Sequence, residues 1–155
     1  MYQVGIRNFT SDNTLTFANC TKLSGGFRKD LLQRVDYNIN EPTTSFVGFF
    51  EKCKAITNNF ECELPTTIKD ISCFCSECTN LTRVSENLFP LFYIFNLINV
   101  SEMFKACTAL TDFPPSANNL WNLPEIQNVR FISNQAFANC PVSSCIPTEI
   151  QDNWI

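Results

Sequence analysis

The most regular segment of the chain reads Val100-Ser-Glu-Met103-Phe104-Lys-Ala-Cys107-Thr-Ala-Leu110-Thr-Asp-Phe113-Pro114. Its apolar residues at 100, 103, 104 and 107 fall at i, i+3, i+4 and i+7, a spacing that places one apolar stripe along two turns of a helix. Leu110 and Phe113 then follow with two polar residues between them, and Pro114, which has no N–H to donate to a sheet ladder, ends the segment. The stretch therefore predicts a short helix, a turn and a short strand.

The same pattern recurs five times, with a cysteine at a fixed place in each unit. The units read Phe17-Ala-Asn-Cys20-Thr-Lys-Leu23, Phe50-Glu-Lys-Cys53-Lys-Ala-Ile56, Cys75-Ser-Glu-Cys78-Thr-Asn-Leu81, Phe104-Lys-Ala-Cys107-Thr-Ala-Leu110 and Phe137-Ala-Asn-Cys140-Pro-Val-Ser143. The intervals between these cysteines are 33, 25, 29 and 33 residues, in the range of stacked supersecondary units. The units centre near residues 13–23, 46–56, 71–81, 100–110 and 133–143 of one domain spanning 1–155.

A single unit of this kind can bury its apolar stripe only against a neighbouring unit. The sequence therefore predicts an α/β fold, a short leucine-rich-repeat-like solenoid of about five irregular helix–turn–strand units with short parallel strands. Its core is expected to contain the repeated aromatic and cysteine positions: Phe17, Cys20, Phe50, Cys53, Cys75, Cys78, Phe104, Cys107, Phe137 and Cys140.

The chain has nine cysteines and no histidine. If the repeated cysteines sit on helices packed about 8–10 Å apart, they are too distant for disulfides, whose Cα atoms lie about 4.4–6.8 Å apart. A Cys62–Cys73 bridge, and a bridge from Cys145 to a neighbour, stay open, because connectivity cannot be read from a sequence.

One cysteine cluster raises the alternatives of a zinc site or a thiol enzyme. The thiolates of Cys62, Cys73, Cys75 and Cys78 could hold a zinc ion tetrahedrally, but Cys75 and Cys78 occupy repeat positions that should face the core. A cysteine nucleophile would need a base, and the chain has no histidine to supply one. We therefore expect neither a catalytic activity nor a cofactor.

The repeat resembles the BspA-like class of leucine-rich repeats. Their unit is similar to a helix ending in Phe-x-x-Cys, followed by x-x-Leu, x-x-Ile and Pro, and the run from Cys78 to Phe89 looks like repeats of gut-bacterial and bacteriophage surface proteins. The likeness covers about residues 13–154 and departs from the pattern at 24–44 and 58–63. It implies an adhesion or recognition protein located outside the cell, at the cell surface or on a virion.

Charge and hydropathy exclude two classes of partner. The net charge is −4 and the lysines and arginines are scattered, so the basic footprint of a nucleic-acid binder is missing. The most apolar stretch, 88–100, is shorter than the ~20 residues of a spanning helix, and residues 1–15 show no secretory signal.

These observations favour a non-enzymatic module that recognises a protein or host-surface ligand. The expected ligand-contacting residues are the variable ones beside the short strands: Thr82, Arg83, Thr111, Asp112 and Ser144. The alternative is a structural subunit of a larger assembly such as a phage tail, because a solenoid stopping just after Trp154 would leave an open apolar end.

Overall fold

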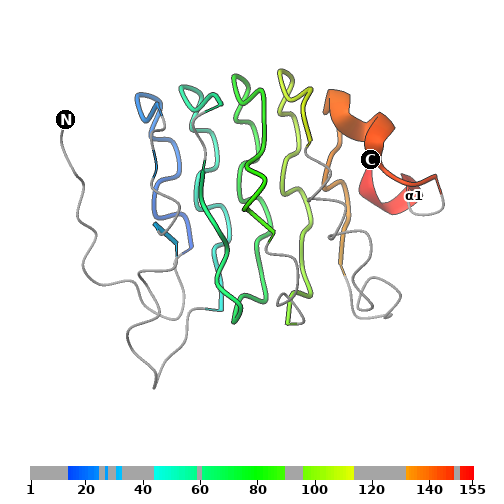
Figure 1. Ribbon diagram of the computed structural model, residues 1–155, viewed down its shortest axis with the longest axis horizontal. Coiled ribbons are helices and arrows are strands. Elements are labelled where there is room, and N and C mark those ends of the chain that lie inside the picture. Colours follow the sequence, from blue (N-terminus) through cyan, green and yellow to red (C-terminus); the bar gives the residue numbers. More distant parts are fainter. Residues whose placement is uncertain are drawn as a thin grey trace.

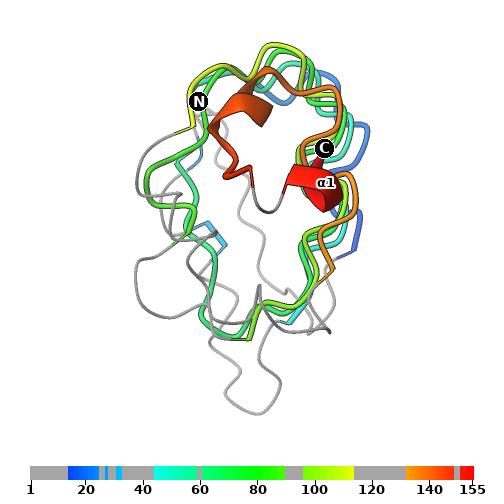
Figure 2. The same ribbon diagram turned by 90° about the vertical axis from the view of Figure 1, so that its right-hand side faces the viewer.

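The computed structural model describes residues 14–24, 27, 31–32, 44–58, 61–89, 96–113, 132–148 and 151–155. The chain runs in successive coils that lie side by side along the long axis of the molecule (Figure 1). We number the coils first to fifth by the repeated cysteine that each contains, in the order Cys20, Cys53, Cys78, Cys107 and Cys140. Seen along that axis, the coils lie one behind another around a common interior (Figure 2). Two short helices lie near the C-terminal end, the 3-10 helix η4 (Pro141–Cys145) and the α-helix α1 (Gln151–Trp154). Most of the connection at 24–44 lies outside the described residues.

The five segments expected to be helical are pairs of tight turns. In the second coil the Phe49 N–H donates to the Phe46 carbonyl at 3.2 Å, and the Cys53 N–H donates to the Phe50 carbonyl at 3.1 Å. The third residue of each turn has a left-handed φ, +58° at Gly48 and +60° at Lys52. A bond from residue i to i+3 with positive φ at i+2 alone is a type II turn. The helix prediction is therefore wrong for these segments.

Every coil repeats this pair of left-handed residues at a separation of four. The pairs are Leu15 and Asn19, Gly48 and Lys52, Cys73 and Glu77, Glu102 and Ala106, and Gln135 and Asn139.

Hydrogen bonds between coils explain why the turns replace helices. The N–H groups of Gly48, Phe50 and Lys52 each donate at 2.8 Å to a carbonyl of the third coil, those of Ser72, Phe74 and Ser76. The equivalent bonds join the other neighbouring coils, and they run in the same direction from the earlier coil to the later one. Donors that a helix would pair internally thus join separate coils, which satisfies the buried backbone as fully as a helix would.

Short parallel pairings flank the turns. Ser45, Asp70, Asn99 and Ile132 form a row of parallel bridges before the turns, and Arg83 pairs with Asp112 after them. Strands paired in this way lie about 4.8 Å apart.

Side chains of the first row fix where the turns begin. Asp70 Oδ1 accepts the Ser72 N–H at 2.8 Å, and Asn99 Oδ1 accepts the Ser101 N–H at 3.1 Å. Asn99 Nδ2 also donates to Asp70 Oδ2 at 3.0 Å, which joins two coils.

The core is a column of aromatic rings and thiols. The ring of Phe50 is stacked on Phe17 at 5.6 Å and meets the edge of Phe74 at 5.4 Å, and Phe137 is stacked on Trp154 at 6.1 Å. Seven of the ten expected core residues are fully buried: Phe50, Cys53, Cys75, Cys78, Phe104, Cys107 and Phe137. Cys140 is 4% exposed.

The first coil differs from that expectation. Phe17 is half-buried and Cys20 is exposed. In the next coil the thiol of Cys53 faces the preceding coil, where it donates to the Phe17 carbonyl. Cys20 has the same place in the first coil, and the described residues contain no coil before it. The prediction of a buried Cys20 is therefore wrong.

The C-terminal helix α1 lies against the fifth coil. The N–H groups of Gln135 and Phe137 donate to the carbonyls of Asn153 and Trp154 at 3.2 and 2.7 Å. Trp154 is 2% exposed and packs on Phe137. The expected open apolar surface is therefore not found at this residue. No helix in the described part of the chain is long and apolar enough to cross a bilayer.

Candidate ligand-binding face

The face beside the second parallel pairing carries four of the five expected ligand-contacting residues. Thr82, Arg83, Thr111 and Asp112 are all exposed, and we call these four residues the recognition face. They lie on adjacent coils, because the N–H groups of Thr111 and Asp112 both donate to the Thr82 carbonyl at 3.2 Å. The structure thus brings the two threonines side by side, and likewise Arg83 and Asp112.

Buried neighbours position these exposed side chains. Leu81 and Val84 on one coil and Leu110 on the next are fully buried, whereas the four residues of the recognition face beside them are exposed. The Val84 N–H donates to the Asp112 carbonyl at 3.3 Å. The recognition face therefore rests on a rigid, packed support.

Arg83 lies between two carboxylates. Its Nη2 is 2.6 Å from Glu86 Oε1, and its Nε is 3.1 Å from Asp112 Oδ2. The three side chains are 45%, 64% and 56% exposed, so these ion pairs contribute at most about 1 kcal/mol each. They hold the planar charged groups in place while leaving them accessible to a ligand.

Hydroxyl residues recur at one position of the repeat, and the sequence-based expectation named three of the five. Four residues after each repeated cysteine stands a serine or threonine: Ser24, Thr57, Thr82, Thr111 and Ser144. We call these five residues the hydroxyl row. Aligning the five units on their cysteines would have revealed it, since no other outward position keeps one chemical type in all five.

Members of the hydroxyl row differ in their setting. Ser24, Thr82 and Thr111 are exposed and Thr57 is partly exposed, and the Thr57 hydroxyl lies 3.5 Å from Asn58 Oδ1. Ser144 lies in η4, and its side chain is outside the described part of the structure. The structure therefore places Thr82 and Thr111 together and leaves the contribution of Ser144 as a prediction.

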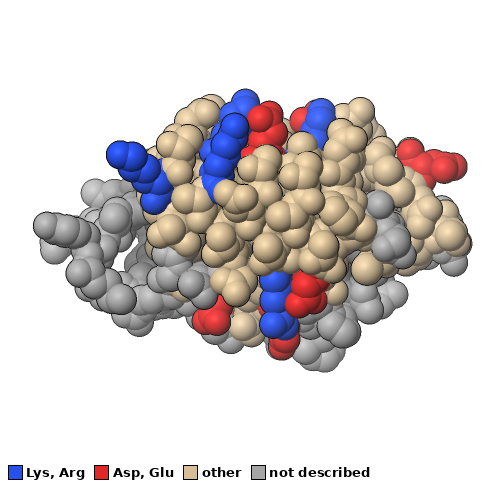
Figure 3. All heavy atoms as spheres, turned by 90° about the horizontal axis from the view of Figure 1, so that it is seen from above, with Lys and Arg blue, Asp and Glu red and all other residues tan. Residues whose placement is uncertain are grey.

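Charge elsewhere on the surface is grouped rather than spread. Seen from the end of the coils at which Lys22 lies, charged side chains stand in separate groups with a broad uncharged area between them (Figure 3). Lys52 lies between two carboxylates, with its Nζ 2.7 Å from Glu51 Oε1 and 3.7 Å from Glu77 Oε1. The hydrogen bond to Glu51, with the charges of both carboxylates, raises the pKa of Lys52.

The repeated thiols have a structural partner in the preceding coil. Cys53 Sγ donates to the Phe17 carbonyl and Cys78 Sγ to the Phe50 carbonyl, both at 3.0 Å, and Cys107 Sγ donates to the Cys75 carbonyl at 3.1 Å. Each of these carbonyls also accepts the N–H of its own turn. The small thiol thus fills the core and adds a weak hydrogen bond between coils, which explains the repetition of cysteine.

All nine thiols are free in this structure, including Cys62, Cys73 and Cys145. The prediction that helix spacing keeps the repeated cysteines too far apart for disulfides is wrong, because they lie on coils about 4.8 Å apart rather than on helices about 8–10 Å apart.

Burial makes these thiols poor nucleophiles. It raises the pKa of Cys53 to about 12 and that of Cys140 to about 11, and it raises the pKa of Cys107 well above its usual value. Thiol chemistry requires the thiolate, and these shifts disfavour it.

The considered zinc ligands do not converge. Cys62, Cys75 and Cys78 are buried and Cys73 is partly exposed beside Glu102. No group of three or more His, Cys, Asp or Glu side chains in the described residues is arranged to hold a metal ion. The suggested zinc site at these four cysteines is therefore not formed, because Cys73 lies on the outer side of a turn whose other side holds Cys75.

Comparisons with models of protein families, with curated proteins and with solved structures gave no match. The likeness to BspA-like leucine-rich repeats therefore stays a prediction.

Proposed function

We propose that this chain is a leucine-rich-repeat-like recognition module, located at a cell or virion surface, that binds a protein or host-surface ligand through its recognition face. The observation that carries the proposal is the register of that face. Thr82 lies beside Thr111, and Arg83 beside Asp112, at equivalent positions of two adjacent coils on a support of buried residues. Stacked repeats typically bind ligands on such extended surfaces.

The chemistry of the face supports binding rather than catalysis. Arginine is enriched at the energetic centres of protein interfaces, and its planar group suits carboxylate and amide partners. The Thr82 and Thr111 hydroxyls can each donate and accept hydrogen bonds. A preorganised face lowers the entropic cost of association, since its residues are already fixed by the coils.

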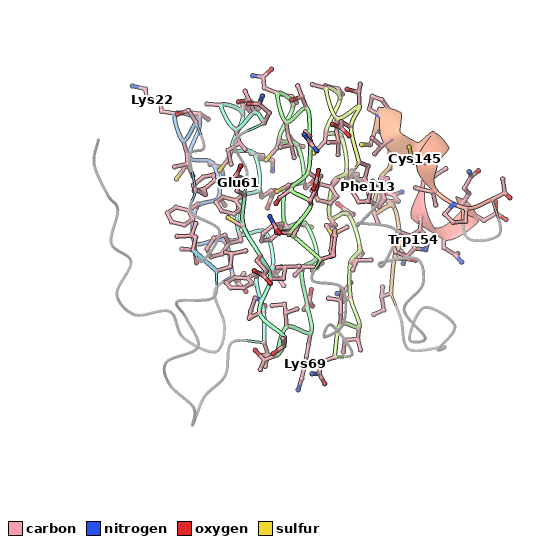
Figure 4. All side chains as sticks on the ribbon, viewed as in Figure 1. Lys22, Glu61, Lys69, Phe113, Cys145 and Trp154 are labelled. Carbon is pink, nitrogen blue, oxygen red and sulfur yellow. The ribbon has the colours of Figure 1, made fainter. Side chains whose placement is uncertain are left out.

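The experiment compares two substituted chains with the unsubstituted protein. The first carries Thr82→Val, Arg83→Ala, Thr111→Val and Asp112→Ala. Valine keeps the branched shape of threonine and removes only its hydroxyl. The second carries Thr66→Val and Lys69→Ala, two exposed residues. Figure 4 shows Lys69 at the end of the coils opposite Lys22.

The measurement is binding of each fluorescently labelled chain to fixed epithelial cells and to immobilised extracellular-matrix proteins. We expect the first variant to bind at least tenfold more weakly and the second to bind like the unsubstituted chain, with equal urea-unfolding midpoints for all three. Undiminished binding by the first variant, or no binding by the unsubstituted chain, would contradict the proposal.

A further inference from the structure

The third coil differs from the other four at one core position. Where they carry phenylalanine, it carries Cys75, three residues before the repeated Cys78. Both side chains are fully buried. The sequence therefore places two thiols in one turn at a position where the repeat needs only one.

The turn holds the two cysteines at a separation that a disulfide can span. The Cys78 N–H donates to the Cys75 carbonyl at 3.1 Å, and Glu77 between them has a φ of +58°. The ends of such a turn lie less than about 7 Å apart, and disulfide-linked Cα atoms lie about 4.4–6.8 Å apart. Both side chains belong to the same buried core, so the two thiols share one apolar environment at the two ends of this turn.

We propose that Cys75 and Cys78 form a disulfide within this turn when the protein folds under oxidising conditions. The free thiols described above are then the reduced form of a redox-active pair. The pairing suits a chain located outside the cell, where disulfides persist, but it is independent of the ligand and of the recognition face. In the oxidised form the Phe50 carbonyl loses the Cys78 thiol as a donor and keeps the Cys53 N–H at 3.1 Å.

The reaction needs an oxidant, and a low-molecular-weight disulfide such as oxidised glutathione supplies it. One cysteine thiolate attacks the glutathione disulfide and releases one glutathione thiolate, which leaves a mixed disulfide. The second cysteine thiolate attacks the protein sulfur of that mixed disulfide and releases the second glutathione thiolate. Two protein thiols are oxidised, one glutathione disulfide is reduced to two thiols, and the protons lost by the cysteines are taken up by the glutathione thiolates and buffer.

Burial decides when this exchange can occur. Neither sulfur is accessible in the folded chain, and burial together with the Cys78 thiol raises the pKa of Cys75. We therefore expect oxidation during folding or on transient opening, and slow oxidation of the fully folded reduced protein.

The test uses the full chain with Cys20→Ser and Cys145→Ser, which removes the two exposed thiols and leaves 9 − 2 = 7 cysteines. The reduced, unfolded protein is refolded in mixtures of reduced and oxidised glutathione. Free thiols are then alkylated in denaturant and counted by intact mass, and the linkage is located by peptide mapping. A matched control adds Cys75→Phe, which restores the residue found in the other coils.

We expect five free thiols in the oxidised test protein, with a single Cys75–Cys78 linkage and a circular dichroism spectrum like that of the reduced form. The Cys75→Phe control should keep all its thiols free. The equilibrium constant for forming the linkage against glutathione should be at least tenfold higher in the folded protein than in urea, because the turn preorganises the two thiols. An equal or lower constant in the folded state, or linkage of other cysteines, would overturn the proposal.

Discussion

Replacing Ala106 by glycine should stabilise the protein if this residue lies in a turn with a left-handed φ, and should destabilise it if the residue lies in a helix. Ala106 has a φ of +57° and is partly exposed. Its N–H donates to the Ala138 carbonyl of the next coil at 2.7 Å, and Cys107 closes the turn on the Phe104 carbonyl. Glycine keeps both of these backbone bonds and removes only a methyl group.

Two opposing terms set the magnitude. A left-handed conformation costs an L-residue about 1–2 kcal/mol, and glycine is free of that cost. Glycine loses more conformational entropy on folding, which offsets about 0.4–1 kcal/mol. We therefore expect Ala106→Gly to raise the free energy of unfolding by about 0.5–1 kcal/mol. In a helix the same substitution would lower it by about 1 kcal/mol.

The assay is urea unfolding followed by circular dichroism and by tryptophan fluorescence, with thermal unfolding as a second measure. A change of about 1 kcal/mol moves the melting temperature by about 2–4 °C for a chain of this size. Ala109→Gly is the matched control, since Ala109 is also partly exposed on the same coil but lacks a left-handed φ. We expect this control to be destabilised. If Ala106→Gly destabilises the protein as much as Ala109→Gly does, the assignment of turns is refuted.

Three further outcomes follow from the packing. Phe50→Ala should lower the free energy of unfolding by about 3–5 kcal/mol and Phe50→Leu by about 1–2 kcal/mol. The reason is that this fully buried ring contacts aromatic rings of the preceding and following coils. A loss below about 1 kcal/mol in urea unfolding of Phe50→Ala would be inconsistent with that core. The raised pKa values of Cys53 and Cys140, about 12 and 11, mean that the folded state keeps protons which the unfolded state releases above pH 9. The stabilisation that these protonated thiols give the folded state is complete below that pH and falls as the pH rises further. The urea midpoint should therefore drop between pH 8 and 10.5, and it should drop less in a Cys53→Ala, Cys140→Ala double variant. Equal drops in the two proteins would exclude the thiols as the cause. Trp154→Ala should speed hydrogen exchange at the Phe137 amide, which donates to the Trp154 carbonyl, far more than at the Phe50 amide. Equal protection of the Phe137 amide in Trp154→Ala and in the unsubstituted protein would show that α1 does not cap the last coil.

Only part of the recognition face could be predicted from the sequence. The spacing of the apolar residues Leu81 and Val84 leaves Thr82 and Arg83 between them as exposed positions, and the structure places them so. Ser24 and Thr57 were not predicted to belong to the hydroxyl row, because the repeat is recognised by its buried positions and not by its exposed ones. The contact between Arg83 and Asp112 depends on the register of two coils, which no local pattern specifies.

The amino-acid pattern was enough to predict the repeat and the residues that the second to fifth coils bury. Phe46, Phe49, Phe50 and Cys53 illustrate this, since all four are fully buried as their spacing requires. Their backbone forms turns instead of a helix because of contacts between the coils, which the pattern does not specify. Both conformations bury positions i, i+3, i+4 and i+7, so the pattern of side chains does not distinguish turns from a helix. The deciding energy lies in backbone donors such as the Gly48 N–H, which pairs with a carbonyl of another coil, and that partner exists only once the coils have stacked.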